Sequence, residues 1–154
     1  MSDTVSAVTI SVRAATEVND DLVESFARLI PQLSSSSPAP SASDLLSIID
    51  NPNSVLFIAE VETDGVRSVV GSLTLAFYRI PTGLKAWIED VVVDESARGL
   101  GVGEALNVAA IDEARQRGAK NVSLTSRPSR EAANRLYLRL GFEPYETNLY
   151  RFGL

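Results

Sequence analysis

The 154-residue sequence contains no cysteine and no histidine, and these two absences remove whole classes of chemistry. Without cysteine the protein has no disulfide framework, no thiolate nucleophile and no cysteine-ligated metal site. Without histidine it also lacks the commonest general base and metal ligand. Acid–base chemistry must therefore use carboxylates, tyrosine, lysine or water, and we expect no metal site.

Long apolar runs and an excess of positive charge are missing as well. No run approaches the ~20 apolar residues that a membrane span needs, and the start, MSDTVSAVTISVRAAT, does not resemble a signal peptide. The formal net charge is -6, whereas affinity for a phosphate backbone comes from clustered Lys and Arg. We therefore expect a cytoplasmic protein that has neither nucleic acid nor membrane as a partner.

The length and the composition, 45% hydrophobic and 22% charged residues, are typical of one compact domain spanning residues 1–154. Within it the segment 34–43, SSSSPAPSAS, is too polar and too rich in serine and proline for a core element. This composition predicts a mobile loop. A linker between domains is the alternative, but the 33 residues before it are too few for an independent core.

Hydrophobic periodicity predicts the order β α α β β β α β α β. The expected strands are 5–12, 54–61, 68–78, 86–94, 121–125 and a final extended stretch to 152. The expected helices are 19–33, one opened by Ser43 or Asp44, 100–117, and one that Ser129 caps and Gly141 ends. Turn signals separate the three central runs, which predicts an antiparallel meander in an α/β (α+β) fold.

Three alternating glycines, Gly99, Gly101 and Gly103, lie between an apolar strand and a helix. Glycine lets the backbone approach a ligand closely, and the first N–H groups of a helix have no intrahelical partners. A pyrophosphate at this point would gain charge-assisted hydrogen bonds, and Arg98 adds a fixed positive charge. A flexible turn without a ligand is the alternative.

Two other phosphate-binding loops are excluded by their spacing. The Walker loop needs G-x-x-x-x-G-K-[ST], and the dinucleotide fingerprint G-x-G-x-x-G would need a glycine where Glu104 stands. The pattern Arg98-x-x-Gly101-x-Gly103 instead resembles the signature of the GNAT superfamily of N-acetyltransferases. The segment from Arg130 to Phe142 is similar to that family's N-x-x-A-x-x-L-Y-x-x-x-G-F helix.

The resemblance implies a GNAT-like mixed, mostly antiparallel central sheet, splayed between its fourth and fifth strands and flanked by about four helices. The pantetheine arm of the co-substrate acetyl-CoA is implied to lie in the opening, bonded by backbone groups of Val91 and Val93. Arg130 stands where the family often has Asn, and Asn134 follows four positions later, so either could contact coenzyme A. The implied cofactor-binding residues are Val91, Val92, Val93, Arg98, Gly99, Leu100, Gly101, Val102, Gly103, Glu104, Arg130, Asn134 and Tyr137.

Two acids, Glu89 and Asp90, interrupt the apolar run of the expected central strand, where a buried unpaired charge is costly. Alternation predicts that they face opposite sides, with Glu89 on the face of Val91 and Val93. A primary amine of the lysine type is protonated at neutral pH and must lose a proton before it attacks a thioester. We predict that Glu89 binds or deprotonates the acceptor and that Asp90 recognises it; a structural role for either carboxylate is the alternative.

Tyr137 belongs to an apolar helical stripe, so a packed aromatic ring is one interpretation. The resemblance implies another, in which Tyr137 lies beside the thioester sulfur and protonates the departing thiolate. Tyr78 is a weaker candidate for lining the acceptor pocket. The leading hypothesis is direct acetyl transfer to a small-molecule or peptide amine, and the alternative is a non-catalytic acetyl-CoA sensor. Dimers are common among similar proteins, which leaves a homodimer open.

Overall fold

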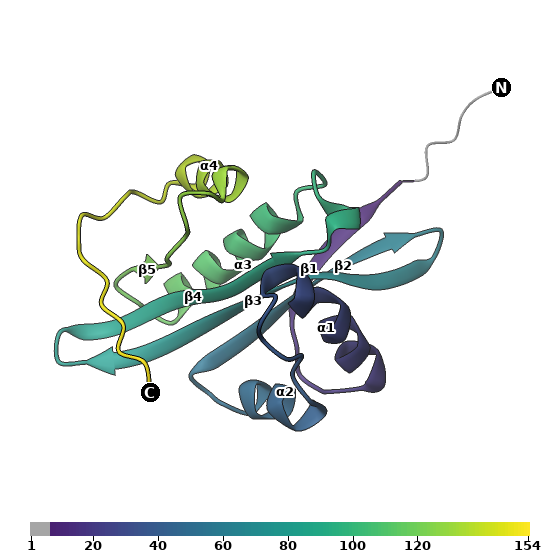
Figure 1. The fold of residues 1–154 in the computed structure, drawn as a ribbon, viewed down its shortest axis with the longest axis horizontal. Helices are drawn as coiled ribbons and strands as arrows, with labels where there is room; N and C mark the ends of the chain where they lie inside the picture. The colour runs from purple at the N-terminus through teal and green to yellow at the C-terminus, as the bar shows by residue number, and fades with distance from the viewer. Residues whose placement is uncertain (1–6) are drawn as a thin grey trace. The chain divides into compact units, whose positions relative to one another are not determined.

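The computed structural model describes residues 7–154 (Figure 1), so Val5, where the first predicted strand begins, lies outside the described residues. The strands are β1 (Thr9–Ala14), β2 (Ser54–Thr63), β3 (Val66–Ile80), β4 (Gly83–Val93) and β5 (Val122–Ser123). The helices are α1 (Asp20–Leu33), α2 (Ala42–Ile49), the 3-10 helix η1 (Glu95–Ala97), α3 (Val102–Gln116) and α4 (Glu131–Leu140). The chain divides into two compact units, a larger one that ends at Leu124 and a smaller one, Thr125–Leu154.

The larger unit holds a mixed sheet whose strand order, β1-β2-β3-β4-β5, follows the chain. The first four strands pair antiparallel, and β5 pairs parallel with β4. A two-residue turn at Asp64 and Gly65, both with positive φ, joins β2 to β3, as the Thr63-Asp64-Gly65 signal indicates. The expected meander and mixed sheet are confirmed.

The pairing of β4 with β5 is short. It joins Ala86 to Val122 and Trp87 to Ser123, and no further residue of β4 has a partner in β5. Beyond Trp87, the edge of β4 on the β5 side therefore has no partner strand among residues 7–154. This is the splay between the fourth and fifth strands that the fold class implies.

Helices cover both faces of the sheet in the larger unit (Figure 1). On one face, side chains of α1 and α2, among them Phe26, Leu29 and Leu45, form a buried cluster with strand residues that include Ile58 and Val92. On the other face α3 lies close to β3. A Cβ added to Gly71 would be 3.0 Å from Val102 Cγ1 and 3.2 Å from Leu106 Cδ1. The sheet is thus the middle of three layers.

Helix α2 begins earlier than predicted. Ser41, and not Ser43 or Asp44, is its N-cap, because the Ser41 hydroxyl accepts from the Asp44 N–H while the Asp44 carboxylate accepts from the Ser41 N–H. This capping box satisfies two backbone donors at once. The hydrogen bonds of Asp44 to the backbone and hydroxyl of Ser41 hold the pKa of that carboxyl below its usual value.

Two predictions in the smaller unit are wrong. The N-cap of α4 is Arg130, which makes no side-chain cap bond, and not Ser129. The turn before the helix is held instead by Asn134, whose amide donates to the Arg127 carbonyl at 3.0 Å. The final strand does not form, because the described residues after Gly141 have no strand pairing. No helix in residues 7–154 combines the length and apolar character that a membrane crossing requires.

Candidate functional site

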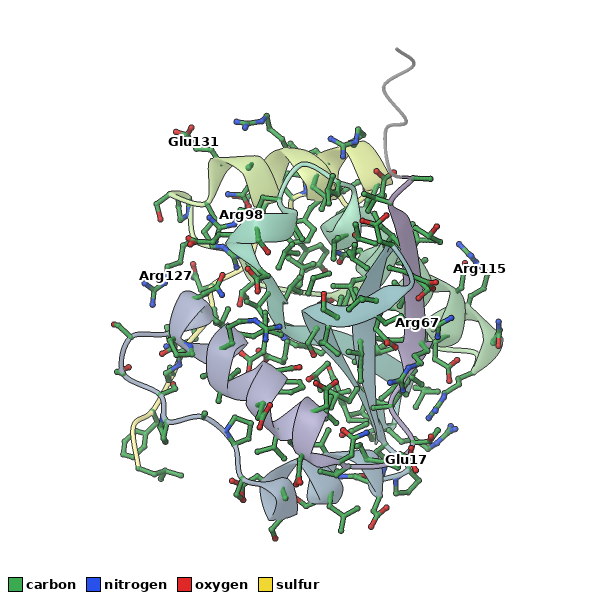
Figure 2. All side chains as sticks on the ribbon, turned by 90° about the vertical axis from the view of Figure 1, so that its right-hand side faces the viewer. Glu17, Arg67, Arg98, Arg115, Arg127 and Glu131 are labelled. Carbon is green, nitrogen blue, oxygen red and sulfur yellow. The ribbon has the colours of Figure 1, made fainter. Side chains whose placement is uncertain are left out.

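The glycine loop between β4 and α3 presents open backbone. Gly99 and Gly101 have φ values of 82° and 85°, a left-handed conformation that favours glycine. A Cβ added to either residue would meet no atom within 4 Å. The neighbouring Arg98 is exposed and extends from the surface of this loop (Figure 2). The loop therefore offers free space and a positive charge to a ligand.

The first turn of α3 continues this surface. Its N-cap is Gly101, which has no side chain with which to cap the first N–H groups, and the first helical bond runs from Ala105 N to Gly101 O at 3.0 Å. Leu100 and Glu104 are exposed, whereas the Val102 side chain is buried against β3. Val102 can therefore serve a ligand only through its backbone.

A polar side chain inside α3 holds the third glycine of the motif. The amide of Asn107 donates to the Gly103 carbonyl at 2.8 Å, and Asn107 is fully buried. Its Oδ1 has no hydrogen-bond partner in the described part of the chain. This arrangement ties Gly103 to the next turn of the helix.

A bulge interrupts β4 at the predicted acids. Glu89 pairs with Thr74 and Val92 pairs with Ser72, so two residues of β4 oppose the single residue between Ser72 and Thr74. The bulged Asp90 has a φ of 51°, which is uncommon for a residue other than glycine. Bulges of this kind redirect side chains and often lie next to binding sites.

The bulge corrects the predicted faces. Residues paired across an antiparallel sheet share a face, so Glu89 lies on the face of Val92, which packs against α1 and α2. Val93 pairs with Gly71 and lies on the α3 face instead. Simple alternation fails because the extra residue shifts the pattern by one. The expected burial is wrong too, since Glu89 and Asp90 are both exposed.

The backbone of β4 supplies polar groups to the open edge. The Asp94 N–H donates to the Val70 carbonyl on β3 at 2.7 Å. Because backbone groups alternate between the two edges of a strand, those of Val93 and Val91 are directed away from β3, toward the edge that β5 leaves open. These are the two residues predicted to bond the pantetheine arm, whereas the Val92 side chain belongs to the core.

Polar bonds fix the start of the loop. Asp94 is buried, and its Oδ1 accepts from the Ser96 N–H at 3.1 Å and from the Ser96 hydroxyl at 3.0 Å. Its Oδ2 accepts from Arg28 Nε at 2.9 Å. Burial alone would raise the pKa of Asp94, but the hydrogen bonds from Ser96 and Arg28 outweigh it and hold this pKa below its usual value.

In the smaller unit, Tyr137 of α4 is buried, and its ring meets Phe142 edge-to-face with centroids 5.7 Å apart. Burial raises the pKa of Tyr137, and the charge of Arg130 opposes this rise. The phenol is thus protonated at neutral pH. Gly141, with a φ of 101°, ends α4 as predicted.

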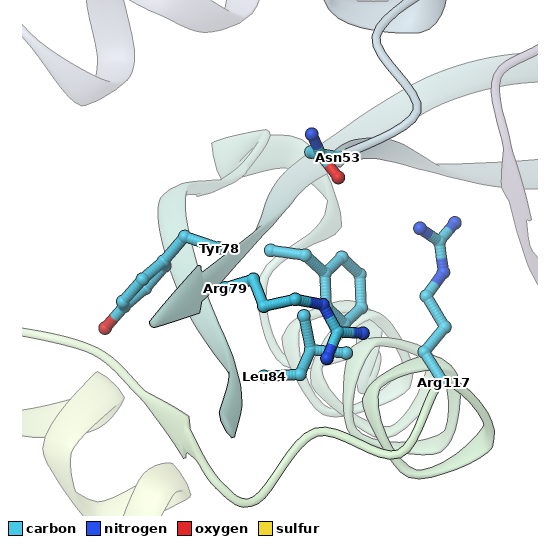
Figure 3. Close-up of a pocket in the computed structure, with 6 residues that line it drawn as sticks. Asn53, Tyr78, Arg79, Leu84 and Arg117 are labelled. Atoms are coloured by element: carbon cyan, nitrogen blue, oxygen red, sulfur yellow. The ribbon is translucent and has the colours of Figure 1, made fainter. Parts of the chain in front are cut away.

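Tyr78 lies at the other end of the sheet from the glycine loop. It pairs with Lys85 near the β3–β4 turn, whereas Glu89 pairs with Thr74. Tyr78 borders a cavity of about 370 Å³, but its ring points away from the arginines that flank the cavity (Figure 3). The structure therefore does not bring Tyr78 together with Glu89. The cavity is lined by Asn53, Phe77, Tyr78, Arg79, Leu84 and Arg117.

Comparison with known families decides the class of this site. The model of the acetyltransferase (GNAT) family matches residues 18–142, which include β4, the glycine loop and α4. The chain belongs to the GNAT family. The resemblance found in the two sequence motifs is therefore confirmed, and with it the class of enzyme, the acetyl-CoA-dependent N-acetyltransferases.

Proteins similar to this GNAT chain occur in a yeast, a trypanosome and a bacterium. N-alpha-acetyltransferase 30 of Schizosaccharomyces pombe is 36% identical over 73 residues, a match that covers 47% of this chain and about half, 48%, of that relative. An acetyltransferase of Trypanosoma brucei is 27% identical, with a TM-score of 0.73 over 95% of this chain and all of the other. A transcriptional regulator of Bacillus halodurans is 28% identical, with a TM-score of 0.75 over 94% of this chain and all of the other.

Sequence reasoning missed several residues that support the glycine loop and the start of α3. Arg28 and Asp94 are 66 positions apart, so no local pattern reveals their ion pair. A weaker signal was available for Asp94, because an acid that follows a strand two residues before Ser96 is typical of a side-chain cap. Asn107 gave no signal, since an asparagine in a helix is usually exposed.

Proposed function

We propose that this GNAT chain transfers the acetyl group of acetyl-CoA to a primary amine by direct attack, with both units belonging to one catalytic domain. The observation that carries the proposal is the succession of an open β4 edge, a glycine loop with left-handed backbone and an uncapped α3 N-terminus. The N–H groups of that first turn, with Arg98, would hold the pyrophosphate. The backbone of Val91 and Val93 would hold the pantetheine arm.

Glu89 is the proposed proton acceptor. It is exposed on the α1/α2 face of β4, beside the edge that would hold the thioester. The amine nitrogen forms a bond to the acetyl carbon, the carbon–sulfur bond breaks, and the amine proton passes to Glu89 directly or through water. Asp90, exposed in the bulge, would add a second negative charge that attracts a cationic acceptor.

Tyr137 is the proposed proton donor to the departing thiolate. Its raised pKa keeps the phenol protonated at neutral pH, as a general acid requires. Of the two candidates for contacting coenzyme A in α4, we favour Arg130. The Asn134 amide already donates to the Arg127 carbonyl, whereas Arg130 makes no side-chain cap bond and carries a charge that suits a phosphate.

We infer that the acceptor is the α-amino group of a peptide. One similar protein is named an N-alpha-acetyltransferase. The chemistry supports this choice, because an α-amino group has a pKa of about 7.7–8.0, whereas a lysine amine has about 10.4. A much larger fraction of an α-amine is therefore neutral at pH 7 than of a lysine amine. Less of it must be deprotonated before it can attack the thioester, which suits an exposed carboxylate such as Glu89 as the proton acceptor.

The test is an acceptor screen read by the release of free coenzyme A thiol. Purified protein and acetyl-CoA are mixed with peptides that have a free N-terminus, with lysine, polyamines, aminosugars and aminoglycosides. The matched control is the same peptide with a blocked N-terminus and an internal lysine. We expect release with the free peptide and none with the blocked one. Release only with another amine would overturn the acceptor class but not the transferase.

A non-catalytic acetyl-CoA sensor is the second candidate, because one similar structure is named a transcriptional regulator. The two functions separate cleanly. A sensor would bind acetyl-CoA, as calorimetry would show, but would release no thiol with any amine in the screen. The transferase would bind acetyl-CoA and also release thiol with its acceptor.

A further inference from the structure

Three consecutive residues at the start of the glycine loop are held by side chains. Asp94 caps η1 through Ser96, as described above, and its other oxygen accepts from Arg28. The next residue, Glu95, donates its backbone N–H to the Gln32 side chain at 2.9 Å. Arg28 and Gln32 lie one turn apart on α1, and the Gln32 amide donates to the Arg28 carbonyl at 3.2 Å.

Arg28 also bonds β3, because its terminal nitrogen donates to the Val69 carbonyl. One guanidinium thus joins three elements: helix α1, the end of β4 and strand β3. A lysine carries a single charged nitrogen and could not reach both acceptors in this fixed geometry, whereas the planar fork of arginine presents donors in two directions. The Asp94 end of the ion pair is shielded from solvent, with its side chain 10% exposed, whereas the Arg28 side chain is 48% exposed.

The two left-handed glycines of the loop, Gly99 and Gly101, have no side chain to pack. The course of the loop therefore depends on its two ends, the α3 end anchored in the core by Val102 and the β4 end anchored by Asp94.

We propose that Arg28 is a positioning residue for the donor site: through Asp94 it fixes where the chain leaves β4, and thus where the loop presents its N–H groups to the pyrophosphate. This rests on the proposed function. Arg28 belongs to α1, which covers the face of Glu89, so a single ion pair ties the acceptor side of the sheet to the pyrophosphate loop. Groups that bind a charged ligand must be held closely in place, because small displacements lose most of the benefit.

The test compares two acetyl donors in Arg28→Met, which keeps the length of the side chain and removes its charge. Acetyl-CoA has the pyrophosphate and S-acetylpantetheine lacks it. We expect kcat/KM for acetyl-CoA to fall at least about tenfold, with S-acetylpantetheine changed less than about twofold. Calorimetry of coenzyme A binding, which needs no acceptor, should show the same loss. A general loss of structure would lower both donors equally.

The matched control is Arg13→Met. Arg13 and Glu60 join β1 to β2 by an ion pair whose side chains are 52% and 13% exposed, against 48% and 10% for Arg28 and Asp94. This control should leave the ratio between the two donors unchanged. Arg28→Lys should restore part of the acetyl-CoA activity, because it keeps the charge.

Equal effects on both donors, or no effect, would overturn the proposal. If Arg28→Met does not fold, Asp94→Asn decides by the same comparison, since its remaining oxygen can still cap η1 while the charge is gone. If the unaltered protein itself binds no coenzyme A, the proposed function fails, and that outcome is distinct from a loss confined to the variants.

Discussion

In this protein without histidine, the proposed proton carriers are one exposed carboxylate and one buried phenol, and a second exposed carboxylate lies beside the first. The carboxylates, Glu89 and Asp90, lie at the bulge of β4, and the phenol is that of Tyr137 in α4. They suit opposite tasks, since a carboxylate is charged and a phenol is neutral at pH 7. The proposed division of labour, one group accepting a proton and the other supplying one, follows from this difference.

Glu89→Gln and Tyr137→Phe test that division. Each change removes a titratable group with almost no change in shape, so we expect turnover to fall between ~10²-fold and ~10⁴-fold with coenzyme A affinity nearly intact. The control is Tyr150→Phe, because Tyr150 is exposed and outside the family match. Wild-type turnover in both variants would leave the two residues with packing and recognition roles only.

Asp94 gives the fold a defined sensitivity to acid. Its pKa is lower in the folded protein than in the unfolded chain, so it stabilises the fold fully above the unfolded value of about 3.9. That contribution is lost as the pH falls through the lower folded pKa. Asp94→Asn should therefore reduce the free energy of unfolding at pH 7. The difference in this free energy between the variant and the wild type should shrink below about pH 4. Urea unfolding across this range measures it, and a difference independent of pH would contradict the ion pair.

At the scale of elements, the contact of β3 with α3 sets the position of the helix that would bind pyrophosphate. Gly71 permits this contact, because an added Cβ would lie 3.0 Å from Val102 Cγ1 and 3.1 Å from the Val92 carbonyl. Gly71→Ala should lower the free energy of unfolding by about 1–3 kcal/mol and, by pushing on Val102, weaken coenzyme A binding. Chemical unfolding and calorimetry measure the two effects. Gly153→Ala, where a Cβ meets nothing within 4 Å, should change neither.

The elements that the sequence predicts well are those with a long, regular pattern. Helix α1 was expected to within one residue because it buries one periodic face, and β2, β3 and β4 to within three residues because each is an apolar run bounded by turn signals. The bulge at Asp90 could not be predicted, since a strand pattern assumes that each residue has one partner, and only the pairing with β3 shows the extra one. The final strand was predicted only as an extended stretch to Phe152, but a strand also needs an edge to pair with.

The candidate site likewise has one part that the sequence predicts and one part that it does not. The glycine loop was evident because glycine, arginine and a helix start are neighbours in sequence. The Arg28–Asp94 ion pair was not, because α1 and the end of β4 meet only in the folded sheet. Local chemistry is readable from a sequence, whereas the supports that hold it in place come from distant segments.

For the whole molecule, coenzyme A should act as a stabiliser. A ligand that binds only the folded state at 100 times its Kd adds about 2.7 kcal/mol, which for a chain of this size corresponds to roughly 5–10 °C in Tm. We expect this rise with coenzyme A and acetyl-CoA, and far less with adenosine, which lacks the pyrophosphate. Thermal unfolding with each ligand measures it. Calorimetry that detects no acetyl-CoA binding at millimolar ligand would rule out the donor site.

The strand order has a consequence for how the larger unit folds during synthesis. Because β1 to β4 pair in chain order, each strand finds its partner already made when it leaves the ribosome, and such local contacts form quickly. The parallel pairing of β4 with β5 must wait until the whole of α3 has been synthesised, because a parallel strand needs a crossover. The opening beside β4 is therefore bounded last, by the one parallel pairing among the described strands, and only after α3 has added its buried side chains, among them Val102 and Leu106, to the core.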